Sequence, residues 1–132
     1  MDAWQTLTAD VASTLAGLPD MHFLVLMTGP PPPRRRFHRA DPDAQPGYVQ
    51  FRFADGILMG ECAARGEEQV AAVRAIGWDP PDPLPYWLHD SSTNHWRAWP
   101  QDEAGQAAEL AVAGLRALGL TDPGQVVREQ GR

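Results

Sequence analysis

The stretch of sequence that decides the fold is Tyr48-Val-Gln-Phe-Arg-Phe-Ala-Asp-Gly-Ile-Leu-Met-Gly-Glu-Cys62. Its first half alternates between two faces, one with Val49, Phe51 and Phe53 and the other with Tyr48, Gln50 and Arg52. Such alternation is typical of a strand that is buried on one side. Asp55-Gly56 can adopt the positive φ angles that a tight turn needs, so the stretch predicts a β-hairpin.

Upstream of the hairpin, the sequence predicts a helix and then a strand. Apolar residues recur at helical spacing from Trp4 to Leu18, which favours an amphipathic helix over about residues 3–17. The next run, Met21 to Thr28, is apolar at nearly every position and therefore predicts a strand that is covered on both faces.

Downstream of the hairpin, helical and extended segments alternate again. Glu67, Glu68 and the capping residue Gly77 bound a short helix, and two short strands are expected near residues 86–88 and over residues 94–99. A long alanine-rich helix is expected to begin at a cap on Asp102 and to end at Gly119, after which residues 128–132 should fray.

These elements predict an α+β fold in the order α-β-β-β-α-β-β-α, with an antiparallel sheet of about five strands covered by about three helices. We expect one domain over residues 1–122 and a C-terminal tail over residues 123–132. Residues 29–46 lose all periodicity and are rich in proline and arginine, which indicates an exposed loop between two strands.

Length and composition exclude several classes of protein. The 132 residues are 43% hydrophobic, which suffices for one core, and the longest apolar run, Phe23 to Met27, is too short to span a bilayer. With no basic segment at the amino terminus, we expect a cytoplasmic protein. Cys62 is the only cysteine, and the net charge of −6 makes nucleic acid an unfavourable partner.

Residues that could carry out catalysis are sparse. His89, Asp90, Ser92 and His95 lie close together in the sequence, and they leave open a small hydrolase-like enzyme. An ordinary polar turn between two strands explains them better, because neighbouring side chains on a turn rarely converge on one reaction centre. No nucleotide-binding loop or metal-ligand set occurs, so we expect neither an enzyme nor a cofactor.

The run Pro30-Pro-Pro-Pro-Arg34-Arg35-Arg36 is the most unusual local feature, and Arg39 follows it closely. A polyproline segment beside arginines fits a solvated loop, a loop that contacts a protein partner, or a phosphate or nucleic-acid contact. The sequence leaves these three interpretations open.

Five tryptophans are many for this length, and four of them lie between residues 78 and 99. Such a cluster fills either a core or a binding surface. Trp87, Trp96 and Trp99 are our candidate contacts for a protein segment, on a sheet face or at an edge where a partner strand could add.

The segment Gly77-Trp78-Asp79-Pro80-Pro81, followed by Asn94-His95-Trp96-Arg97 and the alanine-rich helix, resembles the actinobacterial TY-Chap domains. This family is related to the YbjN proteins and to the chaperones of type III secretion. The likeness covers most of the chain but not the loop at residues 29–46. It implies helices on one side of an antiparallel sheet, protein binding without catalysis, and a homodimer. It indicates no particular binding residue.

Overall fold

The computed structural model describes residues 1–30, 45–81 and 94–132. The helices are α1 (Ala3–Ala16), α2 (Gly66–Ile76) and α3 (Ala104–Ala117), and the strands are β1 (Phe23–Met27), β2 (Tyr48–Ala54), β3 (Ile57–Cys62), β4 (His95–Pro100) and β5 (Val127–Gly131). The predictions for most of the proline and arginine loop and for a strand near residues 86–88 lie outside the described residues.

The five strands form one antiparallel sheet in the order β4-β3-β2-β1-β5. The hairpin of β2 and β3 is confirmed, and its turn residues Asp55 and Gly56 have φ angles of 53° and 79°. The α+β class with an antiparallel sheet is therefore confirmed as well.

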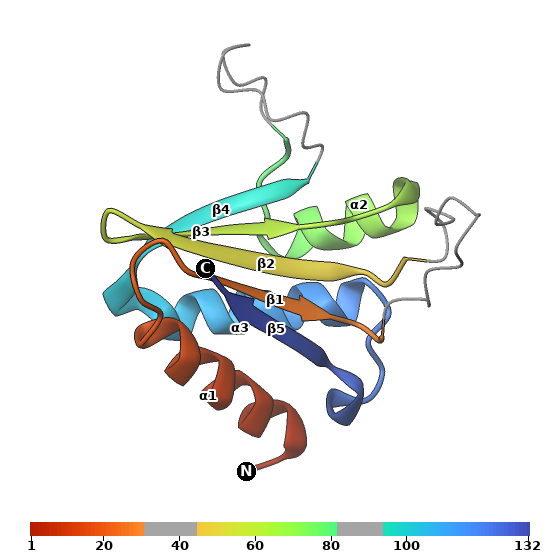
Figure 1. Ribbon diagram of the computed structural model, residues 1–132. Helices are drawn as coiled ribbons and strands as arrows, with labels where there is room; N and C mark the ends of the chain where they lie inside the picture. The colour runs from red at the N-terminus through yellow and green to blue at the C-terminus, as the bar shows by residue number, and fades with distance from the viewer. Residues whose placement is uncertain (31–44, 82–93) are drawn as a thin grey trace, which may run out of the picture.

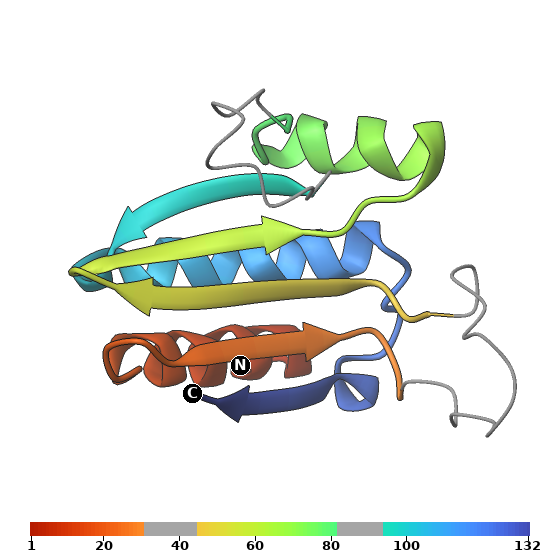
Figure 2. The same cartoon turned by 45° about the horizontal axis from the view of Figure 1, so that its top comes forward.

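The helices pack on one face of this sheet (Figure 1). In Figure 2 the strands lie in front and α1 and α3 lie behind them, and α3 contacts both α1 and α2. In the part of the chain that the structure describes, no helix lies on the opposite face (Figures 1 and 2). The described residues thus form a two-layer sandwich in which none of their helices covers the second face of the sheet.

The core fills the space between the two layers. Strand residues that share the helix-facing side include Leu24, Phe51 and Gly60, which are directly opposite one another on β1, β2 and β3. The bulky rings of Phe51, Trp78 and Trp99 pack together, with ring centroids of Trp99 at 5.9 Å from Phe51 and at 6.1 Å from Trp78. Small residues on α3, such as Ala107, Ala108 and Ala111, let this helix approach the sheet closely.

The ends of the helices agree with the predicted caps at Gly77 and disagree at Asp102. Gly77 ends α2 with a φ angle of 117°, and Asp2 begins α1 in a capping box with Gln5. The prediction that Asp102 caps α3 was wrong, because Asp102 lies within a short 3-10 turn, Gln101–Glu103. The side chain of Gln101 donates to two carbonyl groups at the end of α1, and this contact fixes the turn before α3 begins.

The prediction that residues 128–132 fray was also wrong, because Val127–Gly131 form β5 and pair with every residue of β1. Along the described residues the order is therefore α-β-β-β-α-β-α-β, with the last strand after the last helix. The second edge of β1 needs hydrogen-bond partners, and β5 supplies them. Arg128 adds an ion pair with Asp10 on α1 at 2.9 Å.

The strand β1 differs from its prediction in another way. It lies inside the sheet, but only Leu24 and Leu26 are buried, whereas Phe23, Val25 and Met27 are half-buried on the side without helices. The expectation of cover on both faces was wrong, because the helices all pack on one side. No helix among the described residues has the length and apolar character needed to cross a lipid bilayer.

Candidate functional site

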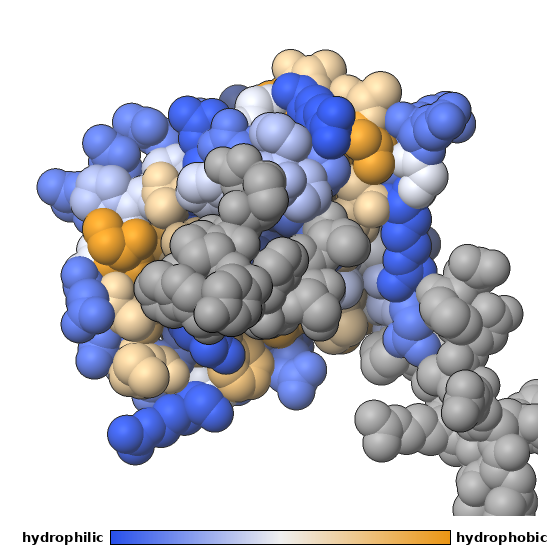
Figure 3. Space-filling model, turned by 90° about the horizontal axis from the view of Figure 1, so that it is seen from above, coloured by the Kyte–Doolittle hydropathy of each residue, from blue (hydrophilic) through white to orange (hydrophobic). Residues whose placement is uncertain are grey.

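The uncovered side of the sheet, called the open face below, is the first candidate surface. Its outward residues on the five strands are Phe23, Val25, Met27, Tyr48, Gln50, Arg52, Ala54, Ile57, Met59, Glu61, Trp96, Ala98, Val127 and Glu129. Ile57 and Met59 are each 42% exposed, and both lie on β3, which has a neighbouring strand on each side. Apolar and polar side chains are mixed on this face, and the view from above in Figure 3 shows separate hydrophobic patches among hydrophilic residues.

Polar side chains on the open face form a small network. The amide nitrogen of Gln50 donates to Oε2 of Glu61 at 3.1 Å, and Asn94 donates to the same oxygen at 3.4 Å and to the hydroxyl of Tyr48 at 3.0 Å. The carboxylate of Glu61 is therefore engaged within the protein and is held in one orientation.

A hollow of about 280 Å³ lies at one end of the open face, where β1 and β2 meet the segment before β2. Its lining includes the apolar side chains of Val25, Met27 and Pro46 beside Tyr48 and Arg65. Arg65 donates to the backbone carbonyl of Gln45 at 3.0 Å. A hollow of this size accommodates one apolar side chain of a bound segment.

The structure places two of the three candidate tryptophans on opposite faces of the sheet. Trp96 lies half-buried on the open face, and its Nε1 donates to the carbonyl of Pro80 at 3.1 Å. Trp99 is 5% exposed and packs beneath the sheet, so it is a core residue rather than a surface contact. Residues three apart on a strand point to opposite faces, which explains the separation. Trp87 lies outside the described residues.

The two edge strands, β4 and β5, are poorly suited to the addition of a partner strand, which the sequence had left as a possibility. On β4, the N–H and C=O of Trp96 already pair with Asp79 at 3.1 and 3.0 Å, and Pro100 has no N–H to donate. On β5, the residues Arg128, Glu129 and Gln130 are polar and exposed, which is typical of an edge protected from pairing.

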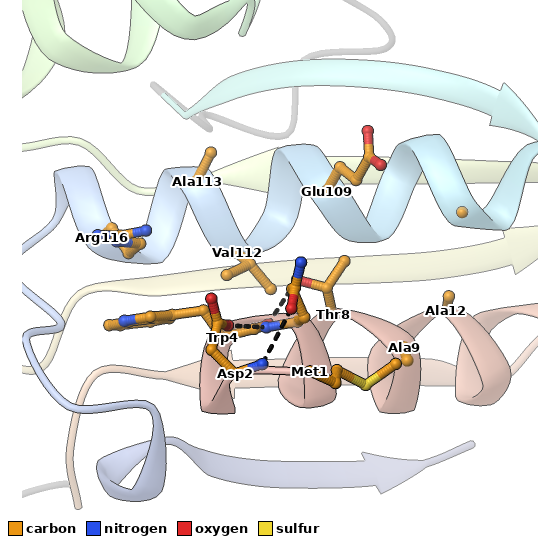
Figure 4. Close-up of a pocket in the computed structure, with 12 residues that line it drawn as sticks. Met1, Asp2, Trp4, Thr8, Ala9, Ala12, Glu109, Val112, Ala113 and Arg116 are labelled. Carbon is orange, nitrogen blue, oxygen red and sulfur yellow. Dashed lines mark hydrogen bonds between the residues drawn. The ribbon is translucent and has the colours of Figure 1, made fainter.

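A groove between α1 and α3 is the second candidate surface (Figure 4). Its volume is about 710 Å³, and small side chains such as Ala9, Ala12 and Ala113 line it. Trp4 and Arg116 lie at one end, where the guanidinium carbon of Arg116 is 4.3 Å from the centroid of the Trp4 ring. One face of this indole is therefore already covered, and the groove presents fewer large apolar groups than the open face.

Of the four residues proposed for a hydrolase, the structure describes only His95, because His89, Asp90 and Ser92 lie outside the described residues. His95 is 2% exposed and lies on the helix-facing side of the sheet. Nε2 of His95 accepts a hydrogen bond from Nε of Arg74 at 3.0 Å, so this lone pair is not available to a hydroxyl nucleophile. Cys62 is directly opposite His95, and burial raises the pKa of its thiol to about 12.

We expect the stability of the fold to depend on pH through His95. Burial of the imidazole, and then the positive charge of Arg74, lower the pKa of His95 below its usual value near 6.5. The unfolded chain therefore binds a proton at a higher pH than the folded chain, and the free energy of unfolding should fall as the pH drops below about 6.5. Urea denaturation between pH 7.5 and 5.5 measures this loss, with a slope of at most about 1.4 kcal/mol per pH unit.

Two variants complete this prediction. His95→Gln should flatten the pH dependence in that range, whereas His22→Gln, a change at a half-buried histidine elsewhere, should leave it in place. An unchanged pH profile in His95→Gln would contradict the assignment.

The other predicted contacts stay predictions. Arg34, Arg35 and Arg36 lie outside the described residues. Within residues 1–30, 45–81 and 94–132, no three histidine, cysteine, aspartate or glutamate side chains are grouped closely enough to hold a metal ion.

The sequence contains few signals from which the open face could have been predicted. Its outward residues alternate with core residues in the same strands, and only Arg52, Gln50 and Glu61 mark one side as polar. The apolar outward residues of β1 looked like core residues.

Comparison with known proteins identifies the family. A family model described as "TY-Chap3: T3SS (YopN, CesT) and YbjN peptide-binding chaperone 3" matches residues 1–131. No curated protein and no solved structure matches the chain. The match spans both candidate surfaces and confirms the resemblance seen in the sequence. The chain belongs to the TY-Chap3 family of peptide-binding chaperones.

Proposed function

We propose that this protein acts without catalysis, by binding a peptide segment of a client protein on the open face. The observation that supports this best is the exposure of Ile57 and Met59 beside the half-buried Phe23, Val25 and Trp96. Apolar surface that stays in contact with water gains free energy when a partner covers it, at about 25 cal/mol per Å². A family of peptide-binding chaperones makes a peptide the natural partner.

The geometry of this face suits a segment that lies on it. Its apolar side chains come from all five strands, so one peptide can contact several of them without pairing with an edge of the sheet. Tyr48, Gln50 and Glu61 provide polar groups at fixed positions between the apolar ones. Such fixed polar groups can orient a bound segment while the apolar side chains supply contact area.

Single substitutions on the open face, each compared with a control substitution elsewhere, test the proposal. Ile57→Ser and Met59→Ser, each made alone, should weaken the binding of peptides selected from a random library by about fivefold to tenfold, because each removes a large apolar contact. The chain offers matched controls outside the face: Ile76 on α2 is 40% exposed and Met21 before β1 is 55% exposed. Ile76→Ser and Met21→Ser should leave affinity unchanged.

Fluorescence anisotropy with labelled peptides measures these affinities, and urea denaturation checks that all four variants remain folded. Equal losses in the face variants and in their controls would contradict the proposal. A loss confined to changes in the groove, such as Ala12→Leu, would move the binding site to the space between α1 and α3.

Three finer points are part of the proposal and rest on the sequence or the family alone. They are a homodimer, a cytoplasmic location, and contacts by Trp87 and by the arginines at residues 34–36. The identity of the client would follow from the sequences that the open face selects.

A further inference from the structure

Arg52 occupies the middle of the open face. It lies on β2, the central strand, directly opposite Phe23 on β1 and Met59 on β3. Its side chain is exposed, and Ile57 lies one row further along the face. A positive charge therefore stands among the apolar side chains that the proposed peptide would cover.

This arginine differs from the others in the described chain by its lack of a partner. Arg74 contacts His95, Arg97 donates to the carbonyl of Gly77 at 2.8 Å, and the remaining partnered arginines are Arg65, Arg116 and Arg128. Within the residues that the structure describes, only Arg52 and the terminal Arg132 have no ion pair, no side-chain hydrogen bond and no cation–π contact.

Among the described residues, the two carboxylates on the open face are Glu61 and Glu129, and neither forms an ion pair with Arg52. Glu61 is held by Gln50 and Asn94, and Glu129 lies on β5, two strands away from Arg52. Although the chain has a net charge of −6, Arg52 therefore presents an unpaired positive charge between the apolar side chains of Phe23 and Met59.

We propose that the peptide held on the open face carries a carboxylate between apolar side chains, and that this carboxylate pairs with Arg52. The inference rests on the proposed function. A purely apolar segment would remove water from the guanidinium without forming hydrogen bonds to it. Burying a charge in this way raises the free energy of the complex. A carboxylate can accept two parallel hydrogen bonds from the guanidinium and so replace the lost water. The face thus selects aspartate or glutamate among apolar neighbours.

Peptide selection tests this preference directly. A random peptide library is selected against the natural protein, against Arg52→Glu and against Arg132→Glu. The last variant changes the net charge equally and also alters an arginine without a partner, but at the chain terminus. We expect acidic residues flanked by apolar ones with the natural protein and with Arg132→Glu, and lysine or arginine at the same position with Arg52→Glu.

Titrations with individual peptides give the size of the effect. One selected peptide is synthesised with Glu, Gln or Lys at the acidic position. For the natural protein, Gln should bind about fivefold and Lys more than about tenfold more weakly than Glu, and Arg52→Glu should reverse this order. The preference for Glu over Gln should shrink at high salt, because an exposed ion pair is screened.

The outcomes separate this inference from the proposed function. Suppose that Met59→Ser weakens peptide binding but Arg52→Glu still selects the same acidic residues. The proposed role of Arg52 is then overturned, whereas the open face remains the peptide-binding site. If Met59→Ser and Arg52→Glu both leave peptide binding unchanged, both ideas are overturned. If Arg132→Glu changes the preference in the same way, the effect arises from the net charge of the protein rather than from Arg52, and the inference is likewise overturned.

Discussion

Replacing Trp99 by alanine is expected to lower the free energy of unfolding by about 3–5 kcal/mol. Trp99 is 5% exposed, and its ring packs against Phe51 and edge-on against Trp78. Alanine would leave a cavity that these rigid neighbours cannot fill. Since small domains are stable by only about 5–15 kcal/mol, the variant should unfold at a much lower urea concentration, which tryptophan fluorescence or circular dichroism can follow.

Trp96→Ala is the matched control. Its ring lies half-buried on the open face and makes one hydrogen bond to Pro80, so its loss should cost less than about 1.5 kcal/mol. The same variant should weaken peptide binding. The reverse order, with Trp96→Ala the less stable protein, would show that the open face is covered by protein rather than available to a partner.

The two tryptophans illustrate what the sequence could and could not predict. Alternation along the strand places Trp96 and Trp99 on opposite faces, and this much follows from the sequence. Which face is covered depends on where the helices pack, and that is decided by contacts between residues far apart in the chain. Both rings therefore looked like equal candidates for binding.

Elements with strong local signals were predicted well. The hairpin follows from the alternation in residues 48–54 and from the turn at Asp55-Gly56, and α1 and α2 begin and end close to their predicted limits. In each case the period of the apolar residues and the capping or turn residue agree with each other.

The strand β5 was missed because its sequence, Val-Arg-Glu-Gln-Gly, has almost no apolar residue and no local preference for an extended structure. It forms a strand because the backbone of β1 offers unpaired groups along one edge and because Arg128 reaches Asp10. Both reasons depend on residues about a hundred positions earlier in the sequence, so no local pattern could reveal them.

The open face was missed for a related reason. Its apolar members on β1 are indistinguishable in type from the core residues beside them, and only the absence of a helix above them makes them a surface. In the sequence, Arg52 is one polar position in an alternating strand. Its proposed role in binding depends on Phe23 and Met59, which lie opposite it on two neighbouring strands.

Replacing Gly60 by valine is expected to lower the free energy of unfolding by about 2–3 kcal/mol. Gly60 faces the helices from β3, and an added Cβ would lie 2.9 Å from Cε1 of Phe51 and 2.9 Å from Cζ3 of Trp99. Real Cβ atoms do not approach so closely, and neither ring can move because both are buried. Valine's preference for strands, at most about 1 kcal/mol, cannot offset this clash. Urea denaturation measures the loss.

Gly105→Ala on α3 is the control, since apart from the adjoining residues and backbone of its own helix no atom lies within 4 Å of the added methyl group. Alanine should raise the free energy of unfolding by about 0.5 kcal/mol through its greater helix preference. A glycine substitution is thus harmful only where the rings are packed. If Gly60→Val were as stable as the natural protein, the rings of Phe51 and Trp99 would have to move apart, and Trp99→Ala would then cost far less than expected.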